Sequence, residues 1–151
     1  MKKLVSGLVV GAVASLVTAG IALGAARGTY KVGATLNAKA EVPASKGAAG
    51  AKGTFSGKYV ENKNGSGVFT WTLSFSGLTG AAGAAHIHLG KPGVAGAVIV
   101  PICGPCKSGA SGKATIPKTV IKALEAGTAY VNVHTAKNAA GEIRGQVKVT
   151  G

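Results

Sequence analysis

Apolar and polar residues alternate one for one in several segments after residue 28, the pattern of strands that bury a single face. The clearest segment is Phe69–Ser76, where four large apolar side chains share one face and four hydroxyl side chains share the other. A second segment is Thr29–Ala40, in which small or aliphatic residues alternate with Lys, Thr and Asn. Because successive side chains point to opposite faces of a strand, the pattern favours half-buried antiparallel sheets over a parallel sheet that is buried on both faces.

Turn residues separate these segments throughout the chain, which contains 25 glycines among its 151 residues. One helix is expected at Lys118–Ala126, because Pro117 precedes it and Gly127 follows it. The sequence therefore predicts an all-β fold, an antiparallel Greek-key β-sandwich with one short crossover helix, in a single domain of residues 27–151. The expected strands are Thr29–Ala40, Thr54–Glu61, Phe69–Ser76, Ala84–Leu89, Ala97–Ile102, Gly112–Ile116, Thr128–His134 and Glu142–Val149.

The first 26 residues have the features of a secretory signal peptide. Lys2 and Lys3 precede a run without charge from Leu4 to Ala26, and small residues at its end fit cleavage near Ala25 or Arg27. A run of this length is also compatible with an uncleaved membrane anchor. In either case the domain is expected to be exported, to a periplasmic, cell-surface or extracellular location, with membrane association only if the signal is retained.

The acidic residues are few and of one type, because the chain has four Glu and no Asp. A calcium-binding EF-hand, an aspartic dyad, a Ser-His-Asp triad and an Asp-held magnesium site each require carboxylates of the missing kind. The composition therefore argues against most hydrolases and phosphotransferases.

The chain is strongly basic, with 17 Lys and Arg against 4 acidic residues. The lysines are dispersed, and Arg27 and Arg144 are the only arginines, although arginine is favoured for reading base edges and for gripping phosphates. A specific nucleic-acid partner is therefore not expected. The partners that fit a diffuse positive field outside the cytoplasm are acidic envelope polymers or lipid head groups.

All three histidines lie in two of the expected strands: His86 and His88 in one, and His134 at the end of another. With Ile87 turned to the core, His86 and His88 should point outward, and the same alternation turns Asn132 and His134 outward. Three imidazoles from neighbouring strands could hold one Cu(II) or Zn(II) ion with a coordination position left open. The alternative is that these are exposed histidines that hydrogen-bond loops or face solvent.

Three polar residues are candidate partners of the imidazoles: Asn132 in the strand of His134, and Glu142 and Arg144 in the last expected strand. Asn132, Glu142 and Arg144 should lie on the outward face, where they could hydrogen-bond the histidines and fix their tautomers. The alternative for Glu142 and Arg144 is an ion pair on an exposed sheet surface, which contributes less than about 1 kcal/mol.

The two cysteines form the motif Cys103-Gly-Pro-Cys106, which has the letters of the thioredoxin dithiol. That chemistry needs a helix after the first Cys, whereas here the motif follows a strand and precedes a loop. A structural disulfide between Cys103 and Cys106 is expected in an exported domain. Dithiol redox chemistry and a mixed Cys/His zinc site are the alternatives.

Five short motifs occur in order along the chain: Ala40-Glu-Val-Pro-Ala44, Ser76-Gly-Leu-Thr-Gly80, Ala85-His-Ile-His-Leu-Gly90, Tyr130-Val-Asn-Val-His-Thr135 and Gly141-Glu-Ile-Arg-Gly-Gln146. Together they resemble the CHRD domain, a module named after chordin that also occurs singly in bacterial exported proteins. The resemblance spans about Thr29 to Val149. It implies an extracellular, mostly β domain and carries no settled activity.

A fainter resemblance links the chain to copper/zinc superoxide dismutase. There the copper is held by a His-x-His strand and a later histidine on a sandwich, which correspond to His86, His88 and His134. This chain has no fourth His and no Asp, so the dinuclear site of that enzyme is excluded and dismutase activity is not expected.

Three functional hypotheses follow from these observations. The first is an exported binding module that holds one transition-metal ion. The second is a metal-free structural or adhesion protein of the cell envelope or matrix. The third, which the sequence favours least, is a copper or dithiol oxidoreductase.

Overall fold

The computed structural model describes residues 28–151, so the expected signal segment and its cleavage site lie outside the described range. Within this range no helix is long and apolar enough to cross a membrane. Residues 28–151 form nine strands, one 3-10 helix and one α-helix, in this order: β1 (Gly28–Asn37), η1 (Ala38–Ala40), β2 (Lys52–Glu61), β3 (Gly67–Ser76), β4 (Ala82–Leu89), β5 (Val98–Cys103), β6 (Ala110–Ile116), α1 (Lys118–Glu125), β7 (Ala129–Thr135), β8 (Ile143–Gln146) and β9 (Lys148–Thr150).

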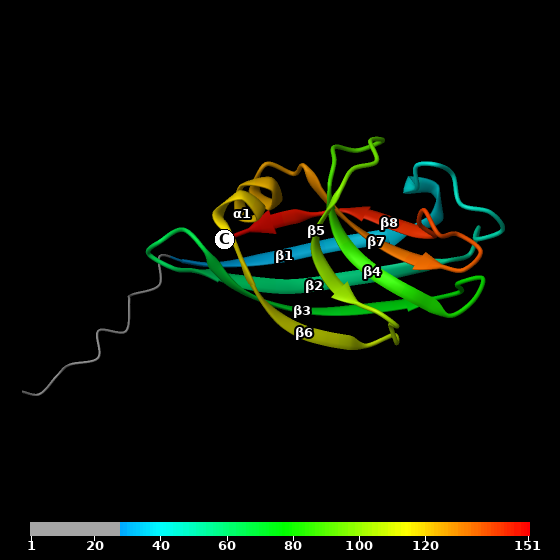
Figure 1. Ribbon diagram of the computed structural model, residues 1–151, viewed down its shortest axis with the longest axis horizontal. Helices are drawn as coiled ribbons and strands as arrows, with labels where there is room; N and C mark the ends of the chain where they lie inside the picture. The colour runs from blue at the N-terminus through cyan, green and yellow to red at the C-terminus, as the bar shows by residue number, and fades with distance from the viewer. Residues whose placement is uncertain (1–27) are drawn as a thin grey trace, which may run out of the picture.

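The strands pair in the order β5-β4-β7-β8-β1-β2-β3-β6, and β9 also pairs with β1. Every pairing is antiparallel. The two end strands of this order, β5 and β6, also contact each other, so the sheet nearly closes around the core (Figure 1). The predicted all-β antiparallel fold with one short helix is confirmed.

Alternate residues of the strands fill the space inside the sheet. Phe55 on β2 packs between Phe69 and Trp71 on β3, with ring centroids 6.0 and 6.4 Å apart. Leu36 on β1 and Ile87 on β4 are fully buried in the same cluster. Burial of one such side chain contributes roughly 1.5–3 kcal/mol, so the period-two pattern supplies the main force that holds the sheet together.

Helix α1 carries the chain from β6 across to β7 and lies at the end of the molecule near the C-terminus (Figure 1). Val120, Ile121 and Leu124 pack their side chains into the core. Gly127 follows the helix with φ of 64°, a left-handed conformation that glycine adopts without strain. The crossover helix was therefore located correctly from the sequence, to within one residue at its C-terminal end.

Two expected strands end differently in the structure. The first stops at Asn37, because the Asn37 side chain accepts a hydrogen bond from the Ala40 N–H and starts the 3-10 turn η1. The last expected strand is interrupted at Val147: β8 pairs with both β7 and β1, whereas β9 pairs with β1. The pairing of β8 with both neighbours connects the two halves of the sheet.

The structure joins the sulfur atoms of Cys103 and Cys106, which closes a short loop between β5 and β6. We expect the double substitution Cys103→Ser/Cys106→Ser to lower the free energy of unfolding by roughly 2 kcal/mol, because the unfolded chain regains the entropy that so short a closed loop removes. Urea denaturation of the variant and of the wild type, with and without reductant, measures this. Rapid alkylation of both cysteines in unreduced wild-type protein would contradict the disulfide.

Candidate metal centre

Loops cover the face of β4, β7 and β8 that points away from the core. The loop of residues 90–97 is held on this face, because the Gly96 N–H donates to the Tyr130 hydroxyl and Arg144 donates to the Lys91 carbonyl. The loop of residues 41–51 meets the loop of residues 136–142, since the Lys46 N–H donates to the Asn138 side chain at 2.7 Å. This half of the sheet therefore has a second, polar buried layer outside the main core.

The covering loops correct one sequence prediction. His88, Asn132, Glu142 and Arg144 were expected to face outward, but their exposed fractions are only 8, 2, 0 and 2%. His88, Asn132 and Arg144 do alternate with core residues along their strands, so the pattern identified the correct side of the sheet, whereas Glu142 lies just before β8. The pattern could not indicate burial, because strand periodicity carries no information about loops from elsewhere in the chain.

The three histidines lie together on this face. His86 and His88 belong to β4, and His134 lies on the adjacent strand β7 opposite Ala84. Each imidazole offers one nitrogen such that the three nitrogens lie within 4.8 Å of one another. The closest approach is 3.1 Å, between Nδ1 of His86 and Nε2 of His134.

Main-chain carbonyls fix the tautomers of two of these histidines. Nδ1 of His88 lies 2.9 Å from the Gly96 carbonyl oxygen, and Nδ1 of His134 lies 3.0 Å from that of Ala139. A carbonyl oxygen only accepts, so each Nδ1 must donate its hydrogen and each Nε2 carries a lone pair. Nε2 of His134 then accepts from His86, whereas Nε2 of His88 is buried and has no partner among residues 28–151.

The surroundings favour neutral imidazoles. Burial lowers the pKa of His86, and the neighbouring His88 lowers it further. Burial also lowers the pKa of His134, against the opposing effect of its hydrogen bond to the Ala139 carbonyl. Neutral imidazole is the form that binds a metal ion, so the cluster is poised for ligation at neutral pH.

A hollow of about 600 Å³ opens beside the three imidazoles. Its other walls are small or aliphatic residues, including Ala84, Val98 and Ala139. Solvent or a small ligand can therefore reach the cluster from this side.

An aromatic stack supports His88 from below. The His88 ring lies parallel to the Tyr130 ring, with centroids 5.0 Å apart, and the Arg144 guanidinium carbon lies 3.4 Å from the Tyr130 centroid. Gly96 must be glycine, because a Cβ atom there would lie 1.6 Å from the Leu89 carbonyl oxygen. Arg144 thus contacts Tyr130 and the loop of residues 90–97. Both of these contact His88, Tyr130 by stacking and the loop through the Gly96 carbonyl oxygen.

Glu142 organises a separate network next to the site. It is fully buried and accepts hydrogen bonds from the Thr79 N–H, the Thr79 and Thr135 hydroxyls and the Asn138 amide. Burial raises the pKa of Glu142, but these hydrogen bonds together outweigh it and hold the pKa below its ordinary value. Its partners among the described residues include neither the histidines nor Arg144. Glu142 instead joins the loop of residues 77–81 to the end of β7 and to Asn138 of its own loop.

Asn132 binds a second buried carboxylate. Its amide donates to both oxygens of Glu41 at 3.0 Å. Burial raises the pKa of Glu41 to about 7, although the Asn132 amide and the Arg144 charge act to lower it. Glu41 therefore exchanges its proton near neutral pH.

This shift predicts a pH effect on stability. A carboxyl with a pKa of about 7 in the folded state and 4.5 in the unfolded state holds its proton longer when folded, so its ionisation lowers stability as pH rises through that interval. Glu41→Gln stays neutral, so we expect its stability relative to wild type to increase steadily over the interval. Denaturation of both proteins at a series of pH values measures the difference in their free energies of unfolding. The histidines are common to both proteins, so the difference reports on Glu41. A difference in stability that does not vary with pH would contradict this.

Comparison with known proteins identifies the chain at the level of a family. A family model described as the CHRD domain matches residues 32–147. The chain belongs to the CHRD domain family. No curated protein and no solved structure matched the chain.

Within this CHRD domain, sequence reasoning found the three histidines but missed what holds them. Gly96 and Ala139 act through main-chain carbonyls, which leave no mark in the type of residue. Glu41 lies in the first of the five sequence motifs, and its position within a loop gave no sign of its contact with Asn132. Asn132, Glu142 and Arg144 lie beside the cluster, where they hold Glu41, the loops and Tyr130.

Proposed function

We propose that this CHRD domain is an exported binding module that holds one transition-metal ion, Cu(II) or Zn(II), through His86, His88 and His134. The observation that carries the proposal is Nε2 of His88, a buried lone pair without a partner beside two other imidazole nitrogens. An unpaired buried polar atom costs roughly 1–3 kcal/mol, which a bound ion would remove. Storage, delivery or stabilisation of the loops are the roles open to such a site.

The donor set fits these two metals. Imidazole nitrogens suit both ions, and three protein ligands with one open side are the usual arrangement of an accessible site. Histidine ligands commonly donate their other N–H to a carbonyl, as His88 and His134 do here. Metal–nitrogen bonds of about 2.0–2.1 Å place two ligand nitrogens at most about 4.2 Å apart, so nitrogens that now lie up to 4.8 Å apart would have to move closer together on binding.

The experiment is a titration of metal-stripped protein. Calorimetry with Cu(II) and with Zn(II) should give one ion per chain, and copper spectroscopy should show nitrogen ligands. Copper should bind more tightly than zinc, following the order of affinities of divalent metals for nitrogen sites. Lack of saturable binding by either ion would contradict the proposal and favour the metal-free envelope protein.

A further inference from the structure

The half of the sheet that β1, β2, β3, β6 and β9 form has an exposed outer face. Five lysines on β1, β2, β6 and β9 are exposed there, among rows of Ser and Thr: Lys31, Lys52, Lys58, Lys113 and Lys148. None of the four glutamates of the chain shares this face. Glu41 and Glu142 are buried under the loops of the other half, Glu125 lies on α1 and accepts from Tyr59, and Glu61 alternates to the inner side of β2.

The strand register places like charges next to each other. Lys31 on β1 is directly opposite Lys58 on β2, and Thr70 of β3 lies between Lys58 and Lys113. Like charges at opposed positions of an antiparallel pair are destabilising, and no carboxylate on this face compensates for them. A negatively charged partner would remove this repulsion.

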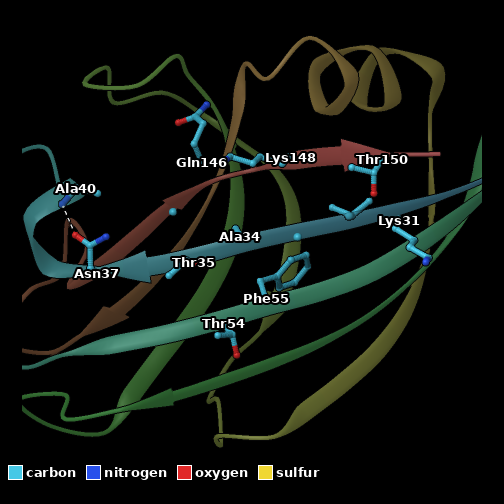
Figure 2. A pocket seen from close by; sticks show the side chains of 13 residues that line it. Lys31, Ala34, Thr35, Asn37, Ala40, Thr54, Phe55, Gln146, Lys148 and Thr150 are labelled. Atoms are coloured by element: carbon cyan, nitrogen blue, oxygen red, sulfur yellow. Dashed lines mark hydrogen bonds between the residues drawn. The ribbon is translucent and has the colours of Figure 1, made fainter.

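A groove follows β1 across the same face. It consists of three adjoining hollows of about 160, 640 and 300 Å³. The first two share Lys31, and the second and third share Thr35 and Thr54. Figure 2 shows the middle hollow between β1 and the C-terminal segment, with Lys31, Lys148 and Thr150 around it.

The groove exists because Gly33 has no side chain. Gly33 pairs with Lys148 on β9 and with Ser56 on β2, so it occupies the middle of the face. Lys31 and Lys148 flank the groove there, and Lys52 lines its far end. The result is a linear channel with positive edges and hydroxyl groups along its length.

We infer that this groove binds an extended acidic polysaccharide lying along β1. The lysines match carboxylate or sulfate groups, and the Ser and Thr hydroxyls match sugar hydroxyls. A lipid surface fits less well, because the large exposed apolar residues Leu89, Val94 and Val98 belong to the other half of the molecule. Among residues 28–151 this face carries no arginine and no exposed aromatic ring, the groups that grip and stack nucleic acids. The inference is independent of metal binding.

The first test removes charge from the groove. Binding of the processed full chain to sodium alginate, a polyuronate, is measured by calorimetry at several salt concentrations. The triple variant Lys31→Gln/Lys52→Gln/Lys148→Gln should bind at least tenfold more weakly and with a shallower salt dependence. The control Lys46→Gln/Lys122→Gln/Lys137→Gln loses the same charge from other exposed positions and should lose less than threefold.

The second test fills the groove without changing charge. A Cβ atom at Gly33 would meet only the Phe55 carbonyl oxygen, at 3.8 Å, so Gly33→Gln should fold normally. We expect it to bind alginate at least fivefold more weakly than wild type. Thr72→Gln lies in the same row of the face but outside the groove, and should bind like wild type.

Three outcomes would overturn the inference. Equal losses in the two lysine triples would show that only the overall charge matters. Wild-type affinity in Gly33→Gln would show that the groove is not used. Binding to vesicles that contain phosphatidylglycerol, without binding to alginate, would assign the face to a membrane.

Discussion

Alanine in place of His134 is expected to weaken Cu(II) binding at least tenfold while the fold remains intact. His134 supplies one of the three nitrogens, and the loss of one ligand of three removes a large part of the binding free energy. Its side chain is only partly buried, so truncation removes little packing. Titration calorimetry measures the affinity, and circular dichroism checks the fold.

The controls separate ligation from effects on the surroundings. Lys137→Ala changes the loop that follows β7 without touching the cluster, and should bind copper like wild type. His86→Ala should resemble His134→Ala, since both remove a partly buried ligand. His88→Ala is less suitable, because it also removes the ring that stacks on Tyr130. Equal copper affinity in wild type and His134→Ala would exclude the three-histidine site.

The affinity for copper should also depend on pH. Copper competes with protons for the imidazoles, so affinity should fall as pH drops below about 6.5, the ordinary histidine pKa. Burial lowers the pKa of His86 and His134, so the fall should be centred below that value. A copper affinity that does not change with acidification would point to other ligands.

Glu142→Gln is expected to lower the free energy of unfolding by roughly 3 kcal/mol. The carboxylate accepts four hydrogen bonds at a fully buried position, and a Gln amide would turn an N–H toward the Asn138 N–H that now donates to Glu142. Glu142 holds loops next to the candidate metal centre, so the amide hydrogen exchange of these loops should also accelerate. Urea denaturation at neutral pH measures the loss of stability.

The same stability difference, measured at low pH, provides a control for this prediction. Because the pKa of Glu142 is lower in the folded protein, its contribution is fully present above the unfolded value of 4.5 and is lost as pH falls through the folded pKa. The difference between wild type and Glu142→Gln should therefore shrink in strong acid. The matched variant Glu125→Gln, at an exposed helix position, should cost less than about 1 kcal/mol. An equally small cost at Glu142 would contradict the network.

The fold was accessible from sequence because its strands repeat a simple pattern. Phe69–Ser76 presents one apolar face, and the structure buries Phe69, Trp71 and Leu73 there. The interruption of the last strand at Val147 was not accessible, because β8 and β9 continue the same alternation and both pair with β1. The 3-10 turn after β1 depends on one side-chain hydrogen bond of Asn37, in a segment whose pattern still reads as strand.

The candidate site was accessible only in part, for a related reason. Strand phase placed His86, His88 and His134 on one side of the sheet, and the antiparallel pairing of β4 with β7 brings them together. Their burial depends on loops far away in the sequence, through contacts such as that between Lys91 and Arg144. Phase is a local property of the chain, whereas covering by loops is not.

The metal content of the protein, purified without chelators from its native compartment, tests the central claim most directly. Elemental analysis should find close to one equivalent of copper or zinc per chain, and much less in His134→Ala prepared in the same way. Wild-type protein with no more metal than His134→Ala, and with no uptake of Cu(II) or Zn(II) on titration, would contradict the proposed metal centre.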